Sequence, residues 1–218
     1  MKVFGKLNRK DQHLLQLAQM KIEGLYGNEI KKLLKKKKVF WVNFFCAGQP
    51  AFHFERQEGA LFKAMMELVN SIVTKYNLPK RVLSMGVSIN PKGTKDQFPH
   101  IDYEGFTSSI FIPLTPVVTQ NTIAYFDPEL SDKDKERIIS GLSAKEHYIL
   151  LQKIESEIFP RMKETRRGFK PFSLVYLPAG LVHRAVANNS GYDRKMLCIM
   201  LTNDTNYLLD EKETEQGV

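Results

Sequence analysis

The chain has 218 residues, of which 43% are hydrophobic and 26% are charged. This hydrophobic content excludes an intrinsically disordered chain, and the length is enough for one domain with a sizeable core. Only two cysteines occur, Cys46 and Cys198, which excludes a disulfide framework and favours a reducing compartment.

The first residues are mostly polar and charged. The opening sequence MKVFGKLNRKDQHLLQ lacks the apolar core of a secretion signal, and no apolar run in the chain reaches the length of a membrane span. We therefore expect a cytoplasmic protein that makes no membrane contact.

The formal net charge is +8, which indicates an anionic partner or substrate. Much of the excess comes from the run Lys35–Lys38 and from Lys31 and Lys32 just before it. The run lacks the interleaved aromatic residues of a nucleic-acid groove, and cations are favourable at the C-terminus of a helix. A solvated helix end is therefore the favoured interpretation, and nucleic-acid binding stays open as the second.

Two helices and a strand are predicted in the first third of the chain. Leucine, isoleucine and alanine recur at helical spacing over residues 10–36, and Gly24 and Gly27 are expected to divide this stretch into two pieces. Residues 39–46, VFWVNFFC, have the composition of a strand. Residues 58–76 form a second amphipathic pattern, which predicts another helix.

Beyond Arg81 the pattern changes to short strands separated by turn residues. The predicted strands cover residues 82–90, 106–114, 121–126, 172–177, 181–187 and 194–202. A mostly helical insert is expected at 131–164, between two of these strands. Helices followed by short strands predict an α+β fold, a double-sheet jelly roll (double-stranded β-helix) with the N-terminal helices packed outside.

We expect the whole chain, residues 1–218, to form a single domain, because it contains no internal repeat and no linker. Residues 1–79 would form a mostly helical support region, and residues 80–203 the jelly-roll core that carries the insert. Residues 204–218 read as a polar tail.

A metal site is predicted from three side chains. In His100-Ile101-Asp102 the imidazole and the carboxylate project from one face of an extended chain, because residues i and i+2 point the same way. His183 lies on a later predicted strand. Two histidines and one carboxylate leave open positions on a metal, which suits iron(II). A histidine and an aspartate at this spacing also occur by chance, so the prediction depends on the neighbouring residues.

Arg194 follows His183 by eleven residues, with the turn sequence NNSGYD between them. If the segment were a hairpin with Ala187 opposite Arg194, then His183 and Arg194 would share a face, about 13 Å apart along the backbone. The two side chains would close much of that gap, and a five-carbon dicarboxylate could span the rest. Its keto acid would chelate the metal, and its far carboxylate would pair with the guanidinium.

His100-x-Asp102, His183 and Arg194 together resemble the signature of the 2-oxoglutarate and iron(II)-dependent dioxygenase superfamily. The resemblance covers about residues 80–203. Within the superfamily, His183 and Arg194 with the Asn-x-Ser between them are similar to the phytanoyl-CoA hydroxylase branch. The resemblance implies a hydroxylase that consumes 2-oxoglutarate and molecular oxygen, releases succinate and carbon dioxide, and acts on an unidentified small molecule or protein side chain.

The position two residues after the arginine is often Ser or Thr in this superfamily, and here it is Met196. A hydroxyl from another strand would replace that hydrogen bond to the co-substrate. The candidates are Ser88, Ser109, Tyr125 and Tyr176, and we assign Ser109 and Tyr125 to the co-substrate together with Arg194.

Asp102 favours hydroxylation, since halogenases of the superfamily lack this carboxylate. Two alternatives remain at this point. One is a cupin-like metal enzyme that uses no oxoacid, and Arg194 argues against it. The other is a non-catalytic binding module of the same fold.

Overall fold

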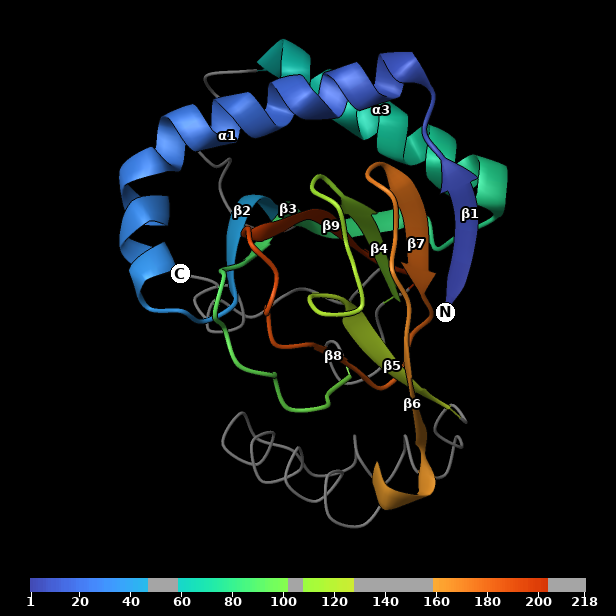
Figure 1. Ribbon diagram of the computed structural model, residues 1–218. Coiled ribbons are helices and arrows are strands. Elements are labelled where there is room, and N and C mark those ends of the chain that lie inside the picture. Colours follow the sequence, from blue (N-terminus) through green and yellow to red (C-terminus); the bar gives the residue numbers. More distant parts are fainter. Residues whose placement is uncertain (47–58, 102–107, 128–158, 204–218) are drawn as a thin grey trace.

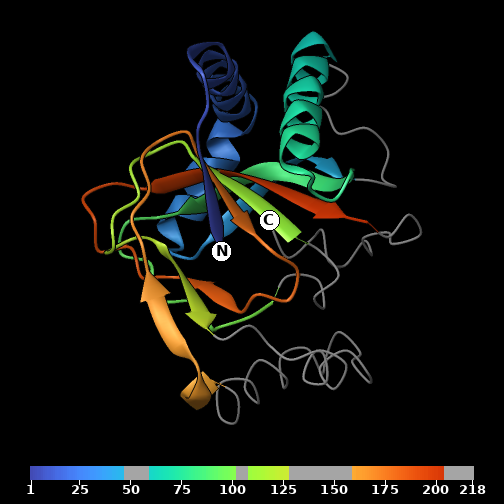
Figure 2. The same ribbon diagram turned by 90° about the vertical axis from the view of Figure 1, so that its right-hand side faces the viewer.

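Two helices lie side by side over one face of a large sheet, and a small sheet faces the other side of it (Figures 1 and 2). The computed structural model describes residues 1–46, 59–101, 108–127 and 159–203. The three layers confirm the predicted class, antiparallel β-structure with helices on one outer face.

Helix α1 spans Arg9–Lys35, and helix α3 spans Gly59–Tyr76. The side chain of Asn8 caps α1 by accepting a hydrogen bond from the Asp11 amide. Tyr26 has non-helical dihedral angles inside α1, so the helix bends between Gly24 and Gly27, as predicted.

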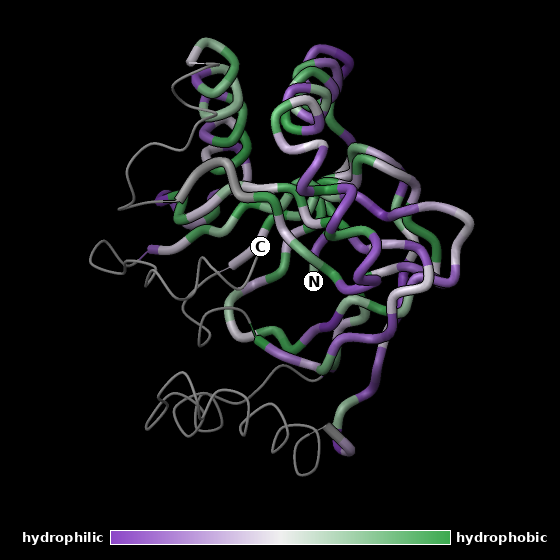
Figure 3. The backbone as a smooth tube through the Cα atoms, turned by 90° about the vertical axis from the view of Figure 1, so that its left-hand side faces the viewer, coloured by the Kyte–Doolittle hydropathy of each residue, from purple (hydrophilic) through white to green (hydrophobic). Residues whose placement is uncertain are grey.

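Both helices alternate between hydrophobic and hydrophilic residues along their length (Figure 3), as expected for helices that pack one face against a sheet. Within the described parts of the chain, neither helix is long and apolar enough to cross a membrane.

The larger sheet has six antiparallel strands in the order β1-β7-β4-β9-β3-β2. Their bounds are Lys2–Lys6 (β1), Ser173–Leu177 (β7), Ser108–Pro113 (β4), Arg194–Thr202 (β9), Arg81–Asn90 (β3) and Phe40–Cys46 (β2). The long central pair β3–β9 runs from Arg81 opposite Thr202 to Asn90 opposite Arg194. This register places the last residue of β3 beside the first residue of β9.

The smaller sheet has three antiparallel strands in the order β6-β5-β8. Their bounds are Lys163–Arg166 (β6), Ile123–Asp127 (β5) and His183–Ala185 (β8). A short 3₁₀ turn, η3 (Phe159–Arg161), precedes β6.

Alternation along β9 divides the core into two clusters. Leu197, Ile199 and Leu201 face the helices and join a cluster that includes residues of α1 and α3. Met196 and Cys198 face the other way and join a cluster between the two sheets. The helix-facing cluster therefore anchors the larger sheet, and the interior cluster lines the space between the sheets.

Three details differ from the expectation. Strand β1 was not predicted, because it is short and its pairing with β7 is a long-range contact. Lys163–Arg166 is a strand, not the end of a helical insert, and it is ordered by pairing with β5. The rest of the predicted insert, up to residue 158, lies outside the described residues. The predicted hairpin between β8 and β9 does not form, because these strands belong to different sheets.

We expect Ile199→Ala to lower the free energy of unfolding by about 2–5 kcal/mol, because it opens a cavity in the helix-facing cluster. Ile199 is fully buried. Met20→Ala on the exposed face of α1 is the control and should change stability by less than about 0.5 kcal/mol. Urea unfolding followed by circular dichroism measures both. Equal losses would contradict this assignment of the core.

Candidate metal and anion site

The backbones of His100 and His183 are joined as an isolated antiparallel bridge. The His100 amide donates to the His183 carbonyl at 2.9 Å, and the His183 amide donates to the His100 carbonyl at 2.8 Å. Residues that exchange both hydrogen bonds carry their side chains on the same side of the strand pair. The two imidazole rings accordingly lie 4.6 Å apart between centroids.

Each of these imidazoles is oriented by a main-chain carbonyl. His100 Nδ1 lies 2.8 Å from the Phe98 carbonyl oxygen, and His183 Nδ1 lies 3.0 Å from the Leu181 carbonyl oxygen. A carbonyl only accepts, so Nδ1 carries the proton and the lone pair of the neutral ring is on Nε2. This is the arrangement typical of metal-binding histidines, in which the second nitrogen is held by a hydrogen bond.

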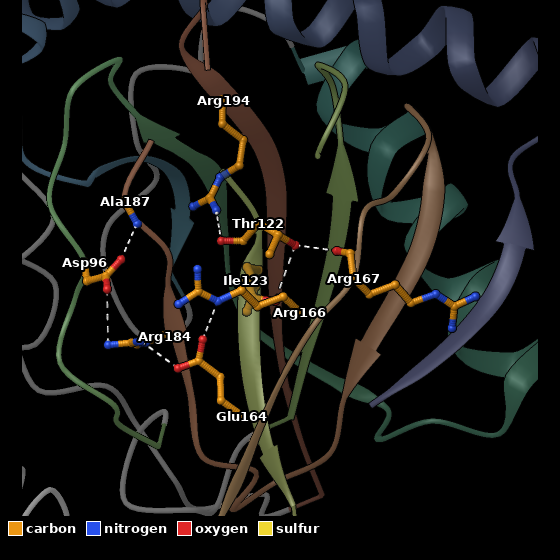
Figure 4. Close-up of polar contacts among 9 residues, drawn as sticks. All are labelled: Asp96, Thr122, Ile123, Glu164, Arg166, Arg167, Arg184, Ala187 and Arg194. Atoms are coloured by element: carbon orange, nitrogen blue, oxygen red, sulfur yellow. Dashed lines mark hydrogen bonds and ion pairs between the residues drawn. The ribbon is translucent and has the colours of Figure 1, made fainter. Parts of the chain in front are cut away.

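The segment that carries His100 is fastened along β8. The Gln97 amide donates to the Ala185 carbonyl at 2.9 Å, and the Asp96 carboxylate accepts from the Ala187 amide. Asp96 also pairs with Arg184, which in turn pairs with Glu164 of β6 (Figure 4). Arg184 follows His183 directly and lies on the opposite face of β8. These contacts lie on the outer face of the smaller sheet, and they hold the two segments that carry His100 and His183 together.

The histidine pair faces the space between the sheets. The ring of Phe111, on the interior face of β4, lies 6.3 Å from the His183 ring. Tyr125 of β5 is directly opposite His183 and packs against the same interior cluster. Asp102 lies outside the described residues, and no group of three possible metal ligands occurs among the residues that the structure does describe. The described part of the site is therefore a histidine pair, a donor set that fits iron(II) with two of the three predicted ligands.

Arg194 is 1% exposed and crosses from one sheet to the other. It begins β9 in the larger sheet, and its Nη1 donates to the carbonyls of Asn121 and Thr122, both at 2.8 Å, just before β5 in the smaller sheet. Figure 4 shows the guanidinium directed toward Thr122. The same Thr122 carbonyl accepts the Val186 amide at 2.9 Å. Among the described residues, the guanidinium is thus held by backbone carbonyls and pairs with no carboxylate.

The surroundings of Arg194 fit an anion. Its buried Nε has no hydrogen-bond partner in the structure, and no described carboxylate pairs with the guanidinium. Burial lowers the pKa of Arg194 to about 10, because the charged form loses hydration. A buried cation without a counter-ion is unfavourable, so a bound carboxylate would restore both charge balance and hydrogen bonding.

The histidine pair and Arg194 are separated by a short length of strand. Phe111, beside His183, is the cross-strand partner of Cys198, which follows Arg194 by four residues, or about 13 Å along β9. Along β5, Thr122 precedes Tyr125 by three residues, or about 10 Å. The hairpin expected from the sequence was wrong, and the His183–Arg194 separation derived from it stays a prediction.

The hydroxyl candidates occupy different places. Ser88 is buried on the interior face of β3, opposite Met196. Along the sheet it therefore lies between Arg194 and Cys198, the position that is opposite Phe111 and nearest to the histidine pair. Tyr125 lies beside His183. Ser109 is opposite Met200, six residues or about 20 Å along β9 from Arg194, and its hydroxyl donates to the Met200 sulfur at 2.9 Å. Tyr125 and Ser88 therefore lie between the histidine pair and Arg194. Ser109 lies beyond the histidine pair, on the side away from Arg194.

Tyr176, the fourth candidate, faces the helices. Its ring lies 5.9 Å from that of Phe4, and it packs against the helix-facing cluster. It is therefore remote from the space between the sheets.

Sequence reasoning missed the groups that hold Arg194. Its two acceptors are main-chain carbonyls, which carry no sequence signal. Asn90, the cross-strand partner of Arg194, is fully buried, and its Oδ1 has no hydrogen-bond partner in the structure. A buried asparagine at the end of a strand could have been suspected from its place before Pro91. Its proximity to Arg194 could not.

No protein-family model matches the sequence, and no curated protein matches it by sequence similarity. Solved structures do match. SnoK, described as a non-haem α-ketoglutarate (2-oxoglutarate)-dependent carbocyclase from nogalamycin biosynthesis, aligns with a TM-score of 0.58 at 14% identity, over 89% of this chain and 76% of SnoK.

Two further structures match over nearly the whole chain. AviO1 from Streptomyces viridochromogenes Tue57 has a TM-score of 0.60 at 14% identity, over 95% of this chain and 90% of AviO1. EctD from S. alaskensis, solved with bound Fe, has a TM-score of 0.56 at 13% identity, over 96% of this chain and 74% of EctD. Identities this low show the fold and not the activity. The chain thus shares its fold with these three solved structures.

Proposed function

We propose that the chain is a 2-oxoglutarate-dependent oxygenase. In this proposal His100, Asp102 and His183 hold iron(II), and Arg194 holds the far carboxylate of 2-oxoglutarate. The observation that carries it is the buried guanidinium of Arg194, which pairs with no carboxylate among the described residues and lies between the same two sheets as a pair of oriented imidazoles. A cupin-like enzyme without an oxoacid would have no use for this buried cation.

The finer architecture that goes with this proposal is a jelly roll, or double-stranded β-helix, in a single domain. The support for it is the pair of antiparallel sheets with an interior cluster between them. In such a fold the metal and its co-substrate lie between the sheets, where His183 and Arg194 point.

Each residue has a separate task in the proposed reaction. Bound iron(II) would supply the activation of molecular oxygen for attack on a C–H bond. The imidazoles are pre-oriented by backbone carbonyls, so they lose little freedom on binding metal. Arg194 fixes the far carboxylate and thereby the direction of the keto acid. Phe111, Val175 and Met196 give the interior an apolar lining that excludes water.

The proposed overall reaction consumes 2-oxoglutarate, molecular oxygen and a substrate C–H group. It yields succinate, carbon dioxide and an alcohol, with one oxygen atom in succinate and one in the alcohol. Hydroxylation is proposed because Asp102 keeps the carboxylate that halogenases lack. The substrate is a small molecule or a protein side chain.

Two measurements test the proposal. Adding 2-oxoglutarate to iron-loaded protein under nitrogen should produce a weak visible absorption band, since the keto acid then chelates the iron. In air, a metabolite and peptide screen should find compounds that stimulate succinate formation. A visible band absent at every 2-oxoglutarate concentration would favour the cupin-like alternative. A band without succinate for any compound would favour the binding module.

We expect His100→Ala and His183→Ala each to abolish stoichiometric iron binding and succinate formation, because a facial ligand set loses one of three protein donors. Iron content and succinate would be measured on the same samples. His13→Ala, on the exposed surface of α1, is the control and should retain both. Retained activity in His183→Ala would contradict the ligand assignment.

We expect Arg194→Ala to weaken 2-oxoglutarate binding at least about thirtyfold while iron binding persists, because the far carboxylate loses its only proposed cation in a buried site. Arg194→Lys should recover part of the loss, since an ammonium group cannot form the bidentate contact. Anaerobic titration of the iron-loaded variants measures the affinity directly.

Lys195→Ala is the matched control for Arg194→Ala. Lys195 points to the opposite face of β9 and contacts Glu23 of α1, with Nζ 2.5 Å from Oε1. Burial raises the pKa of Glu23, but hydrogen bonds from Gln19 and Lys195 and the charge of Lys195 together lower it below its ordinary value. The pair therefore belongs to the helix–sheet contact. A larger loss of affinity in Lys195→Ala than in Arg194→Ala would reject the proposed role of Arg194.

A further inference from the structure

The side chain of Asn188, in the connection between β8 and β9, uses all of its hydrogen-bonding capacity. It is fully buried. Its Nδ2 donates to the carbonyls of Asn90 at 2.7 Å and Tyr192 at 2.9 Å. Its Oδ1 accepts from the Ser190 amide at 3.1 Å and from the Ser190 hydroxyl at 2.6 Å. Two donors and two acceptors are the whole capacity of an amide, so this side chain has one allowed orientation.

Ser190 links Asn188 to Asn121, the residue whose main-chain carbonyl accepts a hydrogen bond from the Arg194 guanidinium. The Asn121 Nδ2 donates to the Ser190 hydroxyl at 3.0 Å, and the Asn121 Oδ1 accepts from the Val118 amide at 2.9 Å. The side chain of Asn121 is thus held on both sides. Because the side chain is held, the main-chain carbonyl of Asn121 is also fixed in position. This main-chain carbonyl accepts a hydrogen bond from Arg194 Nη1.

The backbone of Arg194 is also linked to the side-chain amide of Asn188. Asn90, whose carbonyl accepts from Asn188, is the cross-strand partner of Arg194, and the Asn90 Nδ2 donates to the Val186 carbonyl at 3.0 Å. Tyr192, the second acceptor of the Asn188 amide, is two residues before Arg194. Asn188 therefore lies at the junction between the backbone that begins β9 and the carbonyls that hold the guanidinium.

We propose that Asn188, Ser190 and Asn121 form a positioning network for Arg194, so that they set the affinity for the oxoacid without contacting it. This inference rests on the proposed function. An arginine side chain has many rotamers, and an error of about 1 Å in a binding group is enough to weaken binding strongly. The network removes that freedom from both ends of Arg194 before the ligand arrives, which reduces the entropy lost on binding.

The variants are chosen to separate positioning from folding. Asn188→Ala removes the junction and takes one donor from each of the Asn90 and Tyr192 carbonyls. Ser190→Ala removes the hydroxyl at a half-buried position, and with it the hydrogen bonds to Asn121, to Asn188 Oδ1 and to the Tyr192 carbonyl. Ser190→Thr keeps a hydroxyl. Asn189→Ala is the matched control, because Asn189 is exposed in the same connection and makes hydrogen bonds through its backbone amide.

The affinity of iron-loaded protein for 2-oxoglutarate is measured by anaerobic titration, together with iron content and the thermal midpoint. We expect about a tenfold weaker affinity in Asn188→Ala and about three- to fivefold in Ser190→Ala, because a misplaced guanidinium weakens one or two of its own hydrogen bonds to the oxoacid. Asn189→Ala should stay within about twofold, and Ser190→Thr should recover much of the loss. Iron content should not change in any of the four.

A double-mutant cycle distinguishes positioning from a general structural role. If the network acts through Arg194, Ser190→Ala should weaken 2-oxoglutarate by less than about twofold when Arg194 is already alanine. Losses that multiply in full would overturn the proposal, and so would an unchanged affinity in Ser190→Ala. Because Ser190 is half-buried and loses only its hydroxyl, these outcomes can be measured even if Asn188→Ala fails to fold.

Failure of the network and failure of the proposed function give different results. If Arg194→Ala weakens 2-oxoglutarate but Ser190→Ala and Asn188→Ala do not, the positioning role is rejected and the co-substrate assignment stands. If Arg194→Ala leaves the affinity unchanged, the proposed function and the network are both rejected.

Discussion

The structure depends on one buried cation that joins its two sheets. Arg194 belongs to the backbone of the larger sheet and hydrogen-bonds the carbonyls that lead into the smaller one. A guanidinium that is deprived of water destabilises the fold unless every donor finds a partner, and Arg194 Nε finds none in the structure. The protein therefore holds an incompletely paired charge between its sheets, in the place where an anionic ligand would complete it.

The larger sheet can hold that charge because its two faces have separate tasks. Leu197, Ile199 and Leu201 pack against the helices and supply apolar burial. The alternate residues of the same strand, Arg194, Met196 and Cys198, face the interior and are available for the site. The period of two along a strand thus allows stability and binding to be tuned by different residues only one position apart.

Much of the fold could be predicted from local pattern. Helical periodicity located α1 and α3, and short apolar runs located β3, β4, β7 and β9, since these signals are carried by neighbours in sequence. The site followed from spacing in the same way. His100-x-Asp102 signals a ligand pair on extended chain, and His183 with Arg194 eleven residues later matches the superfamily pattern. These residue types and intervals are properties of the sequence alone, although the role of each residue remains a proposal.

Tertiary structure decided how those residues meet. Local pattern indicated a hairpin between His183 and Arg194, but β8 and β9 pair with other strands in different sheets, because the interior cluster is buried only when the chain crosses between layers. Strands β1 and β6 exist through partners far away in sequence, which no window of residues can reveal. The sequence determined the residues of the candidate site and the elements that carry them. Only long-range pairing brought His100 against His183 and placed Arg194 between the sheets. Backbone hydrogen bonds form between the same groups in every residue type, so they leave no local signal in the sequence.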